Sequence, residues 1–309
     1  MDSFFDQEQR CSLAFSELGP CWHLYTPEDH PILFTRDDEF KMAMNLMALC
    51  TRLFPQVRIL TFEWMSNHLH TLSAGREGDI MAQFALLVQM LRRHLKKWGR
   101  PDNLPLFEPK LRPIDGLDDA RNVLVYNNRN GFLVMPTTSP FSYPWGANRY
   151  YFNDDAKNLF YNSQKRLTIR QIRECARGRF ADKINPIRTL DGYACPMDFC
   201  DIEAGERLFR NARHYFYTLS RNIESQKRIA EEISERIFYT DDELFNVLVA
   251  YGKNKYGIGA PGLLPVSAKT ELAKMMHFEY HAGNKQIQRM LKLDAATVES
   301  WFPRQTPTR

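Results

Sequence analysis

The sequence predicts an α+β fold, in which a small ferredoxin-like antiparallel sheet with helices precedes a mostly helical C-terminal region. Strand-like and helix-like stretches alternate up to about residue 150, and helical periodicity dominates after that point. The composition agrees, because 44% hydrophobic and 25% charged residues in a chain of 309 are typical of a folded protein. Disordered, collagen-like and coiled-coil classes are therefore excluded for most of the chain.

The alternation begins with one strand and one helix. Residues 21–25 (CWHLY) are short, aromatic and bounded by prolines, which suits a strand. Residues 37–54 carry apolar side chains at intervals that favour a helix, and Asp37 or Asp38 is placed near its N-cap.

A hairpin and a long helix are expected next. Residues 57–64 (VRILTFEW) are β-branched and aromatic and predict a strand. Residues 68–73 are its expected hairpin partner, with Asn67 in the tight turn. Residues 78–98 place apolar side chains on one helical face.

The last elements of this part are a short extended piece and another helix. We expect the extended piece at residues 104–111, and a helix at residues 118–130 that is stopped by Gly131. The resulting order, β-α-β-β-α-β-α, fits a ferredoxin-like antiparallel sheet with helices on one face. Residues 140–148 (PFSYPWGAN) should close this unit.

Chain length and the change of pattern predict domains at residues 1–150, 151–265 and 266–309. The last is expected to end in a helix-turn-helix-like segment that reads DNA. Its apolar side chains have the spacing of two helices sharing one small core: Ile287, Leu291, Leu293, Val298 and Trp301. The alternative is a helical hairpin used only for packing or self-association.

Charge and cysteine content restrict the function only weakly. Lys and Arg total 41 against 37 Asp and Glu, and the resulting net charge of +4 permits a nucleic-acid partner without requiring one. Six cysteines are too few for a disulfide scaffold, so free thiols are expected. The N-terminal residues do not resemble a signal peptide and no apolar run reaches about 18 residues, so we expect a cytoplasmic protein without a membrane partner.

His68 and His70 form a His-x-His pair on a predicted strand. Residues i and i+2 of a strand point to the same face, so the two imidazoles can share one cation. The pair alone is a weak signal, because 8 histidines in 309 residues produce such spacing by chance fairly often. Two histidines on a half-buried sheet face are the alternative.

Tyr126 and Asn130 lie four residues apart near the end of a predicted helix and therefore share a face. A tyrosine hydroxyl can act as a covalent nucleophile, and an asparagine oxygen suits Mg²⁺ or Mn²⁺. The alternative is a tyrosine that packs on the core beside a capping asparagine.

Together the two segments resemble a known family. The segment MSNHLHTL (residues 65–72) resembles the M-P-N-H-x-H signature of single-tyrosine HUH transposases, in particular the REP-associated tyrosine transposases. Tyr126, Asn130 and Gly131 fall on the Y, N and P positions of the family motif Y-I-x-x-N-P. Residues 143–145 supply the Y-P-W motif that follows.

The resemblance covers roughly residues 20–150. The family's first strand is echoed by residues 21–25 and the entry to its first helix by residues 30–34 (HPILF). Ser66 and Gly131 stand where the family commonly has proline, and neither position supplies chemistry directly.

The resemblance implies a metal-dependent endonuclease and strand transferase that acts on single-stranded or hairpin-flanked DNA. Its implied catalytic domain spans residues 1–150. His68, His70 and Asn130 would bind Mg²⁺ or Mn²⁺, and Tyr126 would be the nucleophile that forms a 5′-phosphotyrosine. A homodimer is also compatible with the family. The alternatives are a non-catalytic or domesticated DNA-binding regulator on this scaffold and an unrelated metallohydrolase that uses His68 and His70.

Two basic segments are candidates for DNA contact. They comprise Arg92, Arg93, Lys96, Lys97 and Arg100, and then Lys165, Arg166, Arg170, Arg173 and Arg177. Trp98, Tyr150 and Tyr151 are candidates for stacking on bases. The alternative for the first segment is a solvated helix end favoured by the helix dipole.

Overall fold

The computed structural model describes residues 4–27, 31–103, 107–134, 143–175, 184–221, 229, 239 and 241–303. The chain forms two compact units, residues 1–222 and residues 223–309. The expected boundary at residue 150 thus falls inside the first unit, where later segments pack against the sheet.

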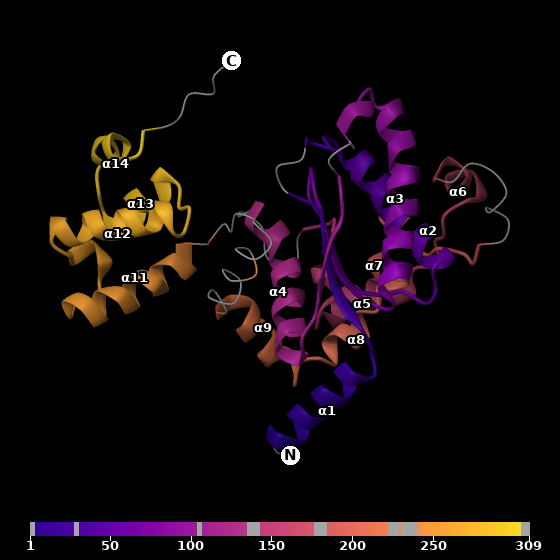
Figure 1. Cartoon of the computed structure of the whole chain (residues 1–309), viewed down its shortest axis with the longest axis horizontal. Coiled ribbons are helices and arrows are strands. Elements are labelled where there is room, and N and C mark those ends of the chain that lie inside the picture. The colour runs from indigo at the N-terminus through magenta and orange to yellow at the C-terminus, as the bar shows by residue number, and fades with distance from the viewer. Residues whose placement is uncertain are drawn as a thin grey trace. The chain divides into compact units, whose positions relative to one another are not determined.

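The first unit contains a four-stranded antiparallel sheet, which confirms the predicted α+β class (Figure 1). Its strands are β1 (Cys21–Tyr25), β2 (Arg58–Trp64), β3 (Leu69–Ala74) and β4 (Lys110–Pro113). They lie in the order β2-β3-β1-β4, and every neighbouring pair is antiparallel. Helix α2 (Asp37–Leu53) connects β1 to β2, and α3 (Glu77–Lys97) connects β3 to β4.

The two faces of the sheet are covered by different helices. Figure 1 shows α2 and α3 on one side and α4 (Leu117–Val134) on the other. On the first side, Leu24 and Leu69 line a small apolar cavity with side chains of α2 and α3. Because side chains alternate along a strand, their neighbours His23 and His70 face α4.

Helix α4 extends beyond its predicted end. Gly131 does not stop it, and the helix continues to Val134. A glycine inside a helix costs only about 1 kcal/mol relative to alanine, so the residues that follow Gly131 can continue the helical conformation.

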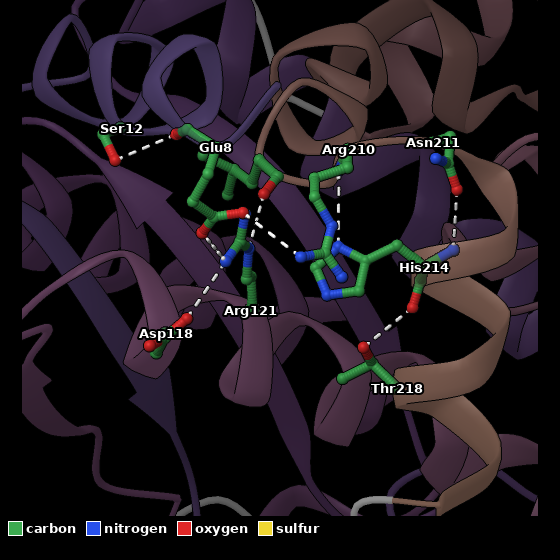
Figure 2. Close-up of polar contacts among 9 residues, drawn as sticks. Glu8, Ser12, Asp118, Arg121, Arg210, Asn211, His214 and Thr218 are labelled. Atoms are coloured by element: carbon green, nitrogen blue, oxygen red, sulfur yellow. Dashed lines mark hydrogen bonds and ion pairs between the residues drawn. The ribbon is translucent and has the colours of Figure 1, made fainter. Parts of the chain in front are cut away.

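The sequence did not predict α1 (Phe4–Ser16), and an ion-pair cluster joins it to α4. Figure 2 shows the Arg121 guanidinium between the carboxylates of Glu8 and Asp118, at 2.6 and 3.0 Å. Arg121 also donates through Nε to the carbonyl of Leu208 at 2.6 Å, and Arg210 lies 3.7 Å from Glu8. The cluster therefore ties two distant segments, α1 and residues 208–210, to the start of α4.

Later segments cover the β2 edge of the sheet. The amide of Trp64 donates to the carbonyl of Trp145 at 2.9 Å, and Glu63 forms a β-bridge with Gly146. At the other end of β2, the amide of Asp201 donates to the carbonyl of Ile59 at 2.7 Å. Since an exposed strand edge carries unpaired backbone groups, this covering satisfies β2 on its outer side.

Short helices and one small hairpin make up the rest of this unit. The helices are α5 (Asp154–Asn162), α6 (Ile169–Cys175), α7 (Pro196–Phe199), α8 (Ile202–Glu206) and α9 (Ala212–Arg221). Strands β5 (Thr189–Leu190) and β6 (Tyr193–Ala194) form a hairpin that was not predicted. The mostly helical character expected after residue 150 is otherwise confirmed.

A series of buried hydrogen bonds connects α4 to the sheet and to α9. Asn128 is bonded to the hydroxyl of Thr61 and donates to the Tyr215 hydroxyl at 2.8 Å. That hydroxyl donates in turn to the Asn148 side chain at 2.6 Å. All four residues are buried, so these hydrogen bonds fix α4 over β2.

We expect Tyr215→Phe to lower the free energy of unfolding by about 1–3 kcal/mol, because it leaves buried polar groups of Asn128 and Asn148 without this partner. Urea unfolding measures the change. Tyr217→Phe on the same helix is the control, since Tyr217 is 60% exposed. Equal stabilities for the two variants would contradict the role given to these buried hydrogen bonds.

The second unit contains four helices in its described part: α11 (Asp241–Tyr256), α12 (Val266–Phe278), α13 (Asn284–Leu291) and α14 (Ala295–Trp301). Ile287, Leu291 and Val298 are buried between the last helices, as their spacing predicts. Lys292 ends α13 in the left-handed conformation at φ 49°, the conformation that glycine usually supplies at this position. Use of this segment to read DNA stays a prediction.

Two further findings concern the whole described part of the chain. Every helix in it is too short or too polar to cross a lipid bilayer. All six cysteines are buried free thiols.

Candidate functional site

His68 and His70 lie together at the end of the β2–β3 hairpin, with ring centroids 5.1 Å apart. The amide of Met65 donates to the carbonyl of His68 at 2.9 Å, which places His68 directly before β3. Nδ1 of His68 lies 2.8 Å from the side-chain oxygen of Asn67. The turn that the sequence predicted therefore also orients the first imidazole.

A third histidine, His23 on β1, was not predicted. Its Nε2 lies 3.2 Å from Nδ1 of His70, and both rings are fully buried. One ring nitrogen of this pair donates and the other accepts. No sequence motif marks a single histidine in a strand. The alternation of side chains along β1 and β3 would nevertheless have placed His23 and His70 on one face of the sheet.

Tyr126 on α4 lies against the same imidazoles. Its ring is edge-on to His70, with centroids 5.6 Å apart, and lies 6.2 Å from His23. Tyr25 on β1 is the partner of His70 in the β1–β3 register, and its ring centroid lies 6.4 Å from that of His70. The structure therefore brings together the predicted tyrosine and the predicted histidine pair, and Tyr126 is only 2% exposed.

Two more buried polar residues accompany this group, and the sequence did not reveal them. Glu63 on β2 stands directly across from His70 in the β2–β3 register and is 1% exposed. Asn127 follows Tyr126, is fully buried, and its side-chain amide has no hydrogen-bond partner among the described residues. The backbone of Asn130 lies in α4, but its side chain is outside the described part.

The described side chains supply only part of the ligands that a metal site needs. Within the described residues, no three His, Cys, Asp or Glu side chains are arranged to hold a metal ion. The two predicted imidazoles are each held through Nδ1, His68 by Asn67 and His70 by His23. Metal-binding histidines are typically fixed in this way through one ring nitrogen while the other coordinates. An amide oxygen from α4 would be a suitable third donor.

Two of the sequence motifs brace the hairpin that carries the histidines. The carbonyl of Ser66 accepts hydrogen bonds from the amides of Leu33 and Phe34, at 2.8 and 2.9 Å. The hydroxyl of Tyr143 donates to the carbonyl of Trp64 at 2.5 Å. Burial, assisted by the nearby Glu63, raises the pKa of Tyr143 well above its usual value, so this hydroxyl stays a donor.

The two basic segments come together only in part. Arg93, Lys96 and Lys97 on α3 line one cavity with Arg173 on α6. Arg92, Lys165, Arg166 and Arg170 are exposed outside it, and Arg177 lies outside the described residues. Arg100 is engaged elsewhere, because it forms an ion pair with the buried carboxylate of Glu39.

The expected base-stacking role of Tyr150 and Tyr151 is wrong for this structure. Both side chains are buried, at 3% and 0% exposure, and the Tyr151 hydroxyl donates to the carbonyl of Leu60 at 2.7 Å. They pack in the core because the segment that carries them returns along β2. Trp98 is half-buried, with its ring 6.4 Å from that of Phe34.

Comparison with protein-family models, with curated proteins and with solved structures gives no match to this chain.

Proposed function

We propose that this protein is a metal-dependent single-strand DNA endonuclease and strand transferase of the tyrosine HUH class. The observation that carries the proposal is the position of Tyr126, whose ring lies against His70 and His23 on the α4 face of the sheet. The sequence motifs concern segments far apart in the chain, and the fold brings these segments to one place. Transposition and DNA recombination are the processes that such chemistry serves.

The topology supports the same proposal. The elements follow the order β1-α2-β2-β3-α3-β4 and the strands lie in the order β2-β3-β1-β4, which supports the ferredoxin-like sheet that the proposal implies. The His-x-His segment enters a strand flanked by neighbours on both sides, and the tyrosine helix follows the last strand. A rigid sheet with a helix packed across it is a suitable support for a reaction that depends on positioning.

In the proposed reaction, the hydroxyl oxygen of Tyr126 attacks the phosphorus of a DNA phosphodiester. The bond from phosphorus to the 3′-oxygen breaks, that oxygen takes up a proton as a free 3′-hydroxyl, and a 5′-phosphotyrosine forms. Attack by another 3′-hydroxyl reverses the step and joins two strands without an external energy source.

His68, His70 and Asn130 would hold a divalent cation beside this tyrosine. When bound, such a cation polarises the phosphoryl oxygens and orients the phosphate. His23 and Asn67 position the two imidazoles. Because Tyr126 is 2% exposed, a phosphodiester reaches its hydroxyl only when the residues that cover it move apart.

The polarity of the linkage provides a direct test. Single-stranded DNA from the flanks of the protein's own gene is labelled at either end and incubated with the full chain and Mg²⁺ or Mn²⁺. We expect the 3′ label to become attached to the protein and the 5′ label to leave on a shorter strand, and chelation by EDTA to prevent both. Turnover of DNA without any protein-linked label would favour an unrelated metallohydrolase.

His23 is expected to act through His70. We predict that His23→Ala weakens the binding of Mn²⁺ by about 10–100-fold, because His70 loses the group that fixes its ring. Isothermal titration with Mn²⁺ measures this affinity without DNA. His94→Ala is the matched control, since it removes another buried imidazole, 4% exposed, from the opposite side of the sheet. Unchanged affinity in His23→Ala would contradict the positioning role.

A further inference from the structure

The cavity between α3 and α6 collects positive charge from two segments of the chain. It has a volume of about 550 Å³, and Arg93, Lys96, Lys97 and Arg173 line it.

Three of the cations that line the α3–α6 cavity are not balanced by acidic groups of the described residues. Arg93, Lys96 and Lys97 make no ion pair with any described residue. Glu174 is the acidic residue in the lining, and it is already paired with Arg170 at 3.3 Å. An ion-paired carboxylate compensates little of the remaining charge, so the cavity attracts anions.

His94 lines the floor of the same cavity, and its pKa reflects the excess of positive charge around it. Its imidazole is 4% exposed and hydrogen-bonds to the backbone of Cys175, which joins α3 to α6. Burial, together with the charges of Lys97 and Arg93, lowers the pKa of His94. The floor is therefore fixed and neutral at pH 7, and the positive charge comes from the side chains around it.

The cavity and the Tyr126 site lie on opposite faces of the sheet but near the same edge. The ring of Phe34 lies 5.4 Å from Trp64, at the end of β2, and 6.4 Å from Trp98, directly after α3. The β2–β3 turn that carries His68 begins at that same end of β2. A polynucleotide that leaves the tyrosine site around this edge therefore meets the basic end of α3.

We propose that the α3–α6 cavity binds backbone phosphates of single-stranded DNA outside the tyrosine site. The choice of this polyanion rests on the proposed function, whereas the affinity for phosphates rests on the lining residues. The cavity holds a flanking part of the substrate strand and takes no part in the attack on phosphorus.

The test measures the salt dependence of DNA binding by the full chain. Fluorescence anisotropy follows a labelled single strand of about 30 nucleotides, which spans more than one site of the usual size. EDTA is present so that binding is measured without cleavage. Each phosphate contact contributes about 0.7 to the slope of log K against log salt concentration for single strands. We expect the double variant Lys96→Gln/Lys97→Gln to reduce that slope by about 1.4, and Arg173→Gln by about 0.7.

Arg76→Gln is the matched control, because Arg76 is an exposed cation at the opposite end of α3. Its slope should equal that of the wild type. An unchanged slope in the double variant, or an equal loss in Arg76→Gln, would overturn the proposal. If inorganic pyrophosphate displaces the strand from Arg76→Gln and from the double variant at the same concentration, the proposal is also overturned.

Formation of the covalent adduct separates this proposal from the proposed function. On a short oligonucleotide that occupies only the tyrosine site, the double variant should form adduct at the wild-type rate. Adduct formation together with an unchanged slope in the double variant contradicts the cavity proposal alone. A reduced slope in the double variant, without any adduct in the wild type, contradicts the proposed function but supports the phosphate site.

Discussion

Tyr126→Phe is expected to abolish the covalent protein–DNA adduct, because the variant keeps the ring against His70 but lacks the oxygen that attacks phosphorus. The adduct is detected as a labelled band that survives denaturing electrophoresis. The loss should be complete rather than partial, since no other group is expected to replace the nucleophile at this position.

Tyr25→Phe is the matched control for that experiment. Tyr25 lies against the same imidazole from β1, is 8% exposed, and loses the same single oxygen in the variant. We expect it to retain adduct formation. If Tyr126→Phe still forms adduct, or if Tyr25→Phe is the variant that loses it, the assignment of the nucleophile is wrong.

Arg121→Ala is expected to have a large effect on stability, about 1–3 kcal/mol in the free energy of unfolding. The Arg121 side chain is 6% exposed and bonds both the carboxylate of Glu8, which is 33% exposed, and the carbonyl of Leu208, so its removal leaves these acceptors without their partner (Figure 2). Urea unfolding measures the loss. Since Arg121 lies on the helix that carries Tyr126, the variant should also reduce adduct formation.

Arg207→Ala provides the comparison. Arg207 forms an ion pair at 2.6 Å with Glu17, the residue directly after α1, but both side chains are about half exposed, at 58% and 49%. An exposed pair contributes at most about 1 kcal/mol. A loss in Arg121→Ala no larger than that in Arg207→Ala would contradict the account of the buried cluster.

The effect of Arg121→Ala should also depend on pH. The hydrogen bond from Arg121 holds the pKa of Glu8 below its usual value. A lowered carboxyl pKa stabilises the folded state above the pKa of the unfolded chain, and this contribution disappears as the pH falls through the lowered pKa. The difference between wild type and variant should therefore shrink under acidic conditions.

Local patterns were sufficient to predict the sheet and most of its helices. The β-branched and aromatic residues 57–64 and the aromatic stretch at residues 21–25 correspond to β2 and β1, because buried strands favour such side chains. The helix at α1 was missed, since its stability comes from the contact of Glu8 with Arg121, far away in sequence. The end of α4 was misplaced, since Gly131 was given more weight as a helix stop than its modest cost supports.

The site was predicted only where a motif marks it. His68, His70 and Tyr126 belong to recognisable segments, whereas His23, Glu63 and Asn127 become part of the site through strand register and burial. Arg100 illustrates the opposite error, because its charge suggested DNA contact while the fold pairs it with Glu39. Such long-range pairings depend on tertiary packing, which periodicity does not reveal.

The most direct test of the central claim is to identify the residue that carries the DNA. The wild-type chain is incubated with single-stranded DNA and Mn²⁺, the adduct is digested with a protease and a nuclease, and the modified peptide is sequenced by mass spectrometry. The account predicts a nucleotide joined through its 5′-phosphate to Tyr126. A nucleotide on any other residue, or cleaved DNA without any modified peptide, would contradict it.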